Sequence, residues 1–293
     1  MSAKIIDGKK ISKEIELNIL KKVKIYTQSG YNPPGLSIIS IGNDPASIVY
    51  IQRKKEACER VGILFNHWNF SIDTKEIKIL QLIKKLNSDS LTHGILVQFP
   101  IDKKFNSLEI ISHICPTKDV DGLHPFNVGC LVQKNPIFRS CTPKGIITLL
   151  KKERINLRSL HSVIVGASNI VGRPMSMEML LEGCTTTITH RFTKELKKYT
   201  KQADILIVAV GKPLFINKDW IKKGSIIIDV GINRLENNKI VGDIDFSSVS
   251  SKASYVTPVP GGVGPMTIVS LLDNIIQSYE KKEKNLFLSP CRR

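Results

Sequence analysis

A hydroxyl, a phenol and an amine are spaced along one face of a predicted helix that begins near Asp44. Asp44 is a good N-cap residue, and Pro45 suits the first helical position. Tyr50 and Lys54 are four residues apart and therefore overlie one another on a helix, with Ser47 on the same side. Such a set can bind and deprotonate a substrate. The alternative is that Tyr50 packs as a helix aromatic while Lys54 is a solvated charge.

A glycine turn in the second half of the chain is the predicted cofactor site. Gly166-Ala167-Ser168 follows an apolar strand, and Pro174 opens a helix shortly afterwards. This arrangement presents backbone N–H groups and a positive helix dipole to a phosphate. The fit to G-x-G-x-x-G is imperfect, since Ser168 stands at the second glycine position and Gly172 follows six residues after Gly166. The strand–turn–helix context favours a dinucleotide over a plain tight turn.

The end of the next strand bears on which dinucleotide binds. An acid that binds the ribose of NAD is usual there, but this chain has Thr189-His190-Arg191, with no acid before Glu195. A cation suits a 2′-phosphate, which favours NADP. Alternatively, Arg191 is one more exposed arginine of a basic protein, and both interpretations stay open.

Three polar residues of the first half lie at or after a strand end. Gln98 ends an apolar strand, and Asp119 and Asp121 lie in a following segment. Ligands of open α/β sheets bind at the carboxyl ends of strands, so Gln98 is well placed for a site. A buried Gln is also a common hydrogen-bond partner in a core, and Asp121 next to Gly122 also suits a turn.

Two stretches of strand–helix alternation predict parallel sheets covered by helices, and therefore an α/β protein. The first has helices at 11–23, 45–61 and 79–86 and strands at 36–41, 64–70 and 94–100. The second has strands at 163–165, 185–189, 203–210 and 225–230 and helices at 174–181 and 193–202. Residues 116–140 are predicted to form an ordered loop, and a helix from Thr142 to about Lys152 marks the domain boundary. A Pro- and Gly-rich segment at 257–265 precedes a last amphipathic helix.

Composition is that of a globular protein in the cytoplasm. The 293 residues are 42% hydrophobic and 24% charged, which suits two domains of ordinary size. No apolar run approaches the about 20 residues of a membrane helix, and the N-terminus lacks the apolar core of a signal peptide. The six cysteines form no C-x-x-C pair, so we expect free, mostly buried thiols and no metal site.

The net charge of +17 permits nucleic-acid binding. The lysines are spread over the whole length, however, and no RNA- or DNA-reading motif accompanies them. A lysine-rich composition is the simpler explanation. A basic nucleic-acid-binding protein with an inactive Rossmann-like domain is therefore only a distant alternative.

Five motifs in order resemble the bifunctional methylenetetrahydrofolate dehydrogenase/methenyltetrahydrofolate cyclohydrolase family, especially its bacterial members. They are PASIVYIQRK at 45–54, GILVQFP at 94–100, KDVDGL at 118–123, VGASNIVGRPM at 165–175 and PVPGGVGPMT at 258–267. The resemblance runs from about Ile6 to Ser278. It departs at Phe99 and Asp102 and in the tail after Glu280, and Phe99 is expected to reshape the pterin pocket slightly.

The resemblance implies two steps in one site. A hydride passes from 5,10-methylenetetrahydrofolate to NADP, and water then opens the methenyl product to 10-formyltetrahydrofolate. It implies that Lys54 is the principal catalytic residue, that Tyr50 stacks on the folate, that Gln98 hydrogen-bonds the lysine and that Asp121 binds the pterin edge. Further folate contacts would come from Val97, Phe99, Gly261, Gly262 and Pro265, and cofactor contacts from Gly166, Ala167, Ser168, Arg191 and Ile232.

The resemblance also implies a domain plan. A folate-binding catalytic domain would comprise residues 1–140 and the returning helix at about 266–283, and a Rossmann-like NADP-binding domain would comprise 141–265. A cleft would separate the two domains, and homodimers would form through the NADP-binding domain. Another NAD(P)-dependent oxidoreductase with a Tyr-x-x-x-Lys pair is the nearest alternative. In short-chain dehydrogenases that pair follows the glycine turn, whereas here it precedes the turn by more than a hundred residues.

Overall fold

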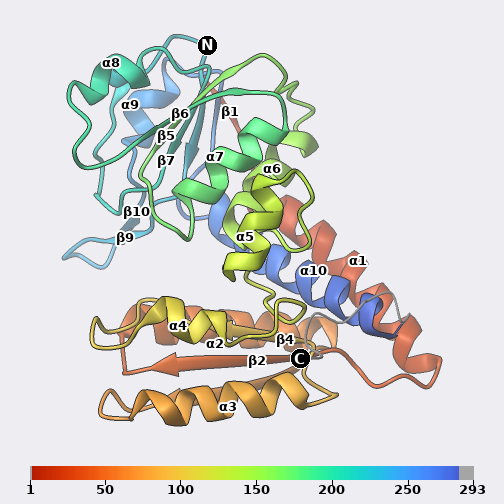
Figure 1. Ribbon diagram of the computed structural model, residues 1–293. Coiled ribbons are helices and arrows are strands. Elements are labelled where there is room, and N and C mark those ends of the chain that lie inside the picture. Colours follow the sequence, from red (N-terminus) through yellow and green to blue (C-terminus); the bar gives the residue numbers. More distant parts are fainter. Residues whose placement is uncertain (1, 284–293) are drawn as a thin grey trace. The chain divides into compact units, whose positions relative to one another are not determined.

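The computed structural model describes residues 2–283, which divide into two compact units (Figure 1). The six-stranded unit contains residues 2–13 and 142–267, and the three-stranded unit contains residues 14–141 and 268–283. Two long helices, α1 (Gly8–Gln28) and α10 (Val263–Glu283), each contribute residues to both units. Both units have the α/β architecture that the strand–helix alternation predicts.

The three-stranded unit is built on a parallel sheet in the order β3-β2-β4. Its strands are β2 (Gly35–Ile41), β3 (Leu64–Phe70) and β4 (Gly94–Val97). Its helices besides α1 and α10 are α2 (Pro45–Val61), α3 (Glu76–Ser88), α4 (Ser107–Ser112) and α5 (Pro125–Val132). The parallel strands bring the carboxyl ends of β2 and β4 to the same edge of the sheet.

The central strand β2 is buried on both faces, and Figure 1 shows α2 and α3 on opposite sides of it. Leu36 and Ile38 pack with side chains of α1, α2 and α10, whereas Ile39 and Ile41 pack with α3 and α4. This alternation follows from the two-residue period of a strand. All seven residues of β2 are therefore buried, and the strand reads as a continuous apolar run broken only by small residues.

The ends of α2 confirm the predicted caps. The Asp44 carboxylate accepts a hydrogen bond from the Ser47 backbone N–H at 2.7 Å, and Pro45 is the first helical residue. At the other end Gly62 has φ +78° and donates its N–H to the carbonyls of Cys58 and Glu59. That conformation favours glycine, and the bonds satisfy carbonyls which the helix leaves free. The helix that bears Lys54 is thus fixed at both ends by local sequence.

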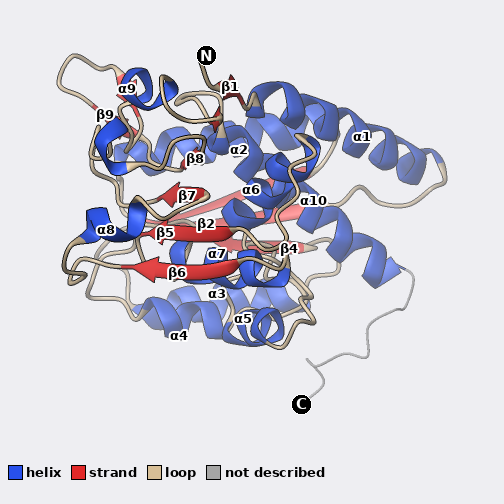
Figure 2. Cartoon of the chain, turned by 90° about the horizontal axis from the view of Figure 1, so that it is seen from above, coloured by secondary structure: helices blue, strands red, loops and turns tan. Residues whose placement is uncertain are grey.

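The six-stranded unit has one parallel sheet in the order β1-β11-β8-β7-β5-β6. Its strands are β1 (Lys4–Ile5), β5 (His161–Val165), β6 (Thr185–Thr189), β7 (Ile205–Val208), β8 (Ile226–Asp229) and β11 (Tyr255–Val256). Its helices include α6 (Cys141–Lys152), α7 (Gly172–Leu181), α8 (Leu196–Thr200) and α9 (Phe246–Ser250). Figure 2 shows β5, β6 and β7 side by side and pointing the same way. The glycine turn and the segments after β6, β7 and β8 therefore leave the sheet at one edge.

Several predicted boundaries are wrong for identifiable reasons. Part of the predicted loop 116–140 is helix α5. His124 caps this helix and Pro125 begins it, but the helix is too short to show a clear period in the sequence. The polar helix predicted at 193–202 is shortened to α8, and the last helix begins earlier than predicted, at Val263. The two-residue strands β1, β9 (Asn233–Arg234), β10 (Ile240–Val241) and β11 are too short to show any period.

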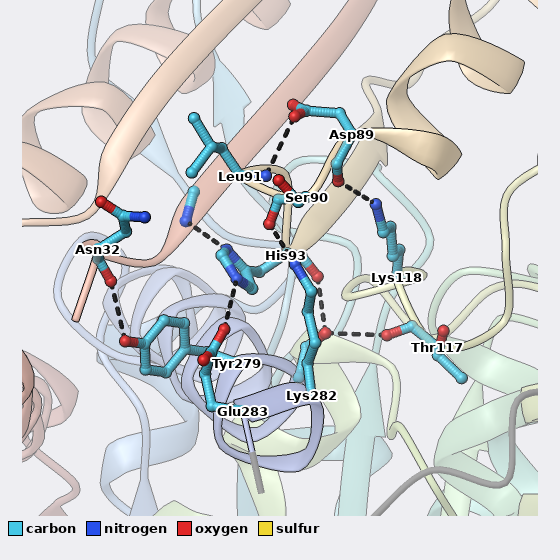
Figure 3. Close-up of polar contacts among 12 residues, drawn as sticks. Asn32, Asp89, Ser90, Leu91, His93, Thr117, Lys118, Tyr279, Lys282 and Glu283 are labelled. Carbon is cyan, nitrogen blue, oxygen red and sulfur yellow. Dashed lines mark hydrogen bonds and ion pairs between the residues drawn. The ribbon is translucent and has the colours of Figure 1, made fainter. Parts of the chain in front are cut away.

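Within the three-stranded unit, α10 is tied to the amino-terminal end of β4 (Figure 3). The Ser278 hydroxyl lies 2.7 Å from the His93 carbonyl and 2.8 Å from that of Thr117, and the Tyr279 phenol donates to the Asn32 carbonyl at 2.8 Å. The rings of His93 and Tyr279 meet edge to face at 4.8 Å. These contacts hold the last helix against the end of the sheet opposite Gln98.

The cysteine prediction holds in part. Cys58, Cys130, Cys141 and Cys184 form no disulfide. It is wrong for Cys115, which is disulfide-bonded, because spacing along the sequence does not reveal a pairing made by the fold. Cys291 lies outside the described residues. Within residues 2–283, no helix combines the length and apolar character needed to cross a bilayer.

Candidate functional site

The structure buries the amine of Lys54. Only 6% of Lys54 is exposed, and its Nζ donates a hydrogen bond to Gln98 Oε1 at 2.9 Å. The same Nζ lies 5.1 Å from the centre of the Tyr50 ring. Burial lowers the pKa of Lys54, since desolvation penalises the ammonium form, while the nearby Asp121 opposes this shift. The pattern of Tyr50 and Lys54 is therefore not a solvated surface pair.

Gln98 is held by the chain that follows β4. Its Nε2 donates to the Phe99 carbonyl at 2.7 Å, and the Ser47 hydroxyl donates to that same carbonyl at 3.2 Å. The Phe99–Pro100 peptide bond is cis. Ser47 thus joins α2 to the end of β4, and the amide oxygen of Gln98 is left to face Lys54. A pocket lined partly by Ser47, Gln98 and Pro100 lies at this edge of the sheet.

Asp121, which is half-buried, completes the cluster with Lys54. Burial raises the pKa of the Asp121 carboxyl, while the Lys54 charge and a hydrogen bond with Cys141 lower it. Asp121 also lines a small pocket with Val97 and Phe99. The three-stranded unit therefore brings together Tyr50, Lys54, Val97, Gln98, Phe99 and Asp121, which come from three separate segments of the sequence.

Two residues that the sequence analysis missed hold the Asp121 segment. Asn274 of α10 is fully buried, and its Nδ2 donates to the carbonyls of Val120 at 2.8 Å and Arg139 at 3.0 Å. The Cys141 thiol donates to the Val120 carbonyl at 3.3 Å. The only signal for Asn274 was a polar residue on the apolar face of the last helix.

Asp119 has a different place from Asp121. It is 2% exposed, and its carboxylate accepts hydrogen bonds from the His124 N–H at 2.8 Å and from Asn127 Nδ2 at 2.8 Å. Burial raises its pKa, and these two bonds lower it. Asp119 therefore organises the turn into α5.

The glycine turn after β5 brings its backbone very close to neighbouring segments. Gly166 has φ +117°, and a Cβ there would lie 2.3 Å from the Ala209 carbonyl oxygen. A Cβ on Gly172 would lie 2.0 Å from the Gly166 carbonyl oxygen, so α7 begins directly against the turn. Ser168, at the usual second glycine position, accepts a hydrogen bond from the Val171 N–H at 3.1 Å. Gly166 and Gly172 each lie too close to a neighbouring carbonyl oxygen for a side chain to fit, which explains the spacing of the two glycines. A turn of this kind before a helix suits a dinucleotide phosphate.

Arg191 leaves the sheet beside this turn. Val165 pairs with Thr189, and the Gly166 N–H donates to the Thr189 carbonyl at 3.1 Å. Arg191 follows two residues later, is exposed, and its guanidinium carbon lies 4.6 Å from the centre of the Phe192 ring. The backbone that carries Arg191 therefore leaves the sheet at the same edge as the glycine turn.

The remaining predicted residues lie in the six-stranded unit. Ile232 follows β8 and is 52% exposed. Gly261, Gly262 and Pro265 lie at the start of α10, and a Cβ on Gly262 would lie 2.6 Å from the Pro258 carbonyl oxygen. Gly262 therefore permits a compact turn that a larger residue would not.

The fold and these residues define a class of protein. The six-stranded unit is a Rossmann-like nucleotide-binding sheet, and the three-stranded unit presents a buried amine beside a phenol and a carboxamide. A nucleotide-binding α/β enzyme with a buried amine has this combination of parts.

Comparison with known proteins identifies the family. Residues 6–121 match the model of the tetrahydrofolate dehydrogenase/cyclohydrolase catalytic domain, and residues 140–283 match the NAD(P)-binding domain of the same family. The chain belongs to the tetrahydrofolate dehydrogenase/cyclohydrolase family. It is a bifunctional enzyme of one-carbon metabolism with methylenetetrahydrofolate dehydrogenase and cyclohydrolase activity.

Solved structures agree over nearly the whole chain. The bifunctional enzyme FolD of Campylobacter jejuni is 44% identical, with 96% of this chain and 100% of that chain covered and a TM-score of 0.93. The bifunctional enzyme of Thermoplasma acidophilum is 33% identical, with 96% and 100% covered and a TM-score of 0.88. The Trypanosoma brucei enzyme, complexed with NADP and an inhibitor, is 29% identical, with 97% and 99% covered and a TM-score of 0.92.

Proposed function

We propose that Lys54 is the principal catalytic residue and that NADP is the preferred cofactor. The observation that carries the first assignment is the buried Lys54 amine, held at 2.9 Å by a neutral carboxamide. In the proposed sequence 5,10-methylenetetrahydrofolate loses a hydride and becomes the methenyl cation. Water then adds to that cation, a proton is released, and the ring opens to 10-formyltetrahydrofolate.

The residues of the three-stranded unit have separate tasks in this scheme. Bound NADP supplies the hydride acceptor. Lys54 takes the proton of the attacking water, which requires its neutral amine, and burial favours that form. Gln98 orients the amine without fixing its charge, as a carboxylate there would. Tyr50 stacks on the folate, and Asp121 binds the polar edge of the pterin.

Contacts to the rest of the folate are assigned to five further residues. Val97 and Phe99 flank Gln98 in the sequence and line a pocket with Asp121. The turn at the start of α10 is the proposed second group of contacts, because its glycines let the backbone approach a ligand closely. That group comprises Gly261, Gly262 and Pro265.

The cofactor is assigned to the carboxyl edge of the six-stranded sheet. Gly166, Ala167 and Ser168 would cradle the pyrophosphate, and the exposed Ile232 would provide an apolar contact. The match to an NAD(P)-binding domain leaves the choice of nucleotide open. Arg191 favours NADP because a guanidinium beside the turn suits a 2′-phosphate.

The nucleotide assignment is tested by an absorbance assay with 5,10-methylenetetrahydrofolate. Wild-type protein is expected to reduce NADP in preference to NAD. Arg191→Ala removes the charge and should raise the KM for NADP by about tenfold while the KM for NAD changes little. Lys194→Ala, a nearby exposed charge, is the matched control. Equal losses with both nucleotides would remove Arg191 from the 2′-phosphate.

The other assignments follow the resemblance. We propose that the three-stranded unit, which includes most of residues 1–140 and of the last helix, binds folate, and that the six-stranded unit, built mainly from residues 141–265, binds NADP. We also propose a homodimer formed through the NADP-binding domain, a cytoplasmic location and no nucleic-acid partner. Light scattering of the purified protein tests the dimer, since a monomeric mass at micromolar concentration would contradict it.

A further inference from the structure

A buried carboxylate in the six-stranded unit has four hydrogen-bond donors around it. Asp243 is fully buried. Its Oδ2 accepts from the backbone N–H groups of Val210 at 2.7 Å and Gly211 at 3.0 Å, and its Oδ1 accepts from the Lys212 N–H at 2.9 Å and from Asn233 Nδ2 at 2.8 Å. Burying a charged group is costly unless it is hydrogen-bonded, and here each oxygen has two donors.

These donors come from two loops at the edge of the sheet where dinucleotides bind. Val210, Gly211 and Lys212 follow β7, and Asn233 follows β8 directly after Ile232. The residue before Val210 is Ala209, whose carbonyl is in close contact with the Gly166 turn. Asp243 therefore connects the segment beneath the glycine turn with the segment that carries the exposed Ile232.

A second buried carboxylate holds Asp243 in place. Asp229, at the end of β8, accepts hydrogen bonds from the Asp243 N–H at 2.9 Å, the Ile244 N–H at 3.1 Å and the Gly231 N–H at 3.1 Å. A Cβ on Gly242 would lie 1.7 Å from the Asp229 carboxylate. These contacts fix the main chain around Asp243, so that its side chain is held between the two loops.

We propose that Asp243 is a positioning residue for the dinucleotide. Its carboxylate holds the loops after β7 and β8 in the arrangement that receives the nucleotide, and it does not itself touch folate. This inference rests on the proposed placement of the nucleotide at Gly166 and Ile232. Asp243 should affect only the dehydrogenase activity, because water addition to the methenyl cation needs no nucleotide.

Asp243→Asn is the decisive variant. An amide has only one acceptor oxygen, and its NH2 group faces donors, so at least one of the loop N–H groups loses its partner. NADPH binding, measured by the change in nucleotide fluorescence, should weaken by about tenfold or more, and the KM for NADP should rise in parallel. Hydrolysis of the methenyl substrate, followed without nucleotide, should stay within about twofold of wild type.

Two further variants complete the experiment. Asp245→Asn changes an acid two residues away, which caps α9 through the Ser248 N–H at 3.1 Å, and it should leave NADPH affinity unchanged. Asn233→Ala removes one donor to Asp243 and should weaken NADPH by about threefold, which decides the question if Asp243→Asn does not fold.

The results separate the proposals. Unchanged NADPH affinity in folded Asp243→Asn, or equal losses of NADPH affinity and of hydrolysis, would overturn the positioning role. Wild-type protein that bound no NADPH would instead overturn the proposed nucleotide site. Weakened NADPH binding with preserved hydrolysis supports the inference.

Discussion

The proposed role of Lys54 as a base depends on what surrounds its amine. Water would keep the ammonium charged, whereas burial makes the neutral form more accessible. Gln98 accepts a hydrogen bond from the amine without adding a negative charge that would restore the ammonium. Asp121 works against the shift, so the pKa of Lys54 depends on both burial and one nearby carboxyl.

Lys54→Met tests this role with a side chain of similar length that carries no proton. Ring opening of the methenyl substrate should fall by at least about 100-fold, the usual contribution of a general base. NADPH affinity should change little, because the nucleotide is assigned to the other unit. Lys55→Met, which alters an exposed lysine paired at 3.9 Å with Glu59, is the matched control and should retain both activities. Normal ring opening in Lys54→Met would show that another group activates the water.

The residues of the site differ in how far the sequence could predict them. The spacing of Tyr50 and Lys54 and the end of the strand at Gln98 are local features, and the structure brings these residues together. Asn274 and Asp243 act through contacts with residues far away in the sequence. Asn274 is marked only by its place on the apolar face of a helix, and no local pattern distinguishes Asp243 from other polar residues.

At the scale of elements, the strongest predictions were those with local chemical signals. Helix α2 has an Asp-Pro start and a glycine end, and both occur where expected. Strand β6 occupies the predicted residues. Strand β1 is different, since its two residues gain their strand geometry only by pairing with β11. A strand stabilised by a distant partner leaves no periodic signal.

The contact between α10 and β4 includes a histidine that should make the three-stranded unit sensitive to acid. Burial lowers the pKa of His93 to about 4, and the positive charges of Lys282 and Lys118 contribute. The unfolded chain has the ordinary value of 6.5, so it binds a proton first as the pH falls. Stability is therefore full above pH 6.5 and is lost between pH 6.5 and about 4.

His93→Gln should make unfolding less dependent on pH in this window. The shift of the pKa corresponds to a loss of up to about 3 kcal/mol on acidification, and Gln does not titrate. Denaturant unfolding at several pH values between 7 and 4 measures the difference. His113→Gln, at an exposed position, is the control. Parallel pH profiles for wild type and His93→Gln would show that His93 does not contribute.

At the scale of the whole molecule, residues 2–283 pass between the two units only within helices. The changes occur after residues 13, 141 and 267, which fall in α1, α6 and α10 respectively. Length and the strand–helix alternation predicted two domains. Pairing of β1 with β11 places residues 2–13 in the six-stranded unit.

This connectivity predicts that nucleotide binding stabilises more than one unit. Helices α1, α6 and α10 contribute residues to both units. Because helix formation is cooperative, unfolding of one unit should destabilise the part of each shared helix that belongs to the other unit. Thermal unfolding should therefore be a single transition. NADPH at 100 times its Kd should stabilise the protein by about 2.7 kcal/mol, which raises the Tm by about 4–5 °C for a chain of this length.

The measurement is differential scanning calorimetry with and without NADPH. Asp243→Asn at the same NADPH concentration is the control and should show a smaller rise, because its affinity is lower. Two separate transitions, of which NADPH moves only one, would contradict the coupling. They would mean that the shared helices can unfold in one half while the other half persists.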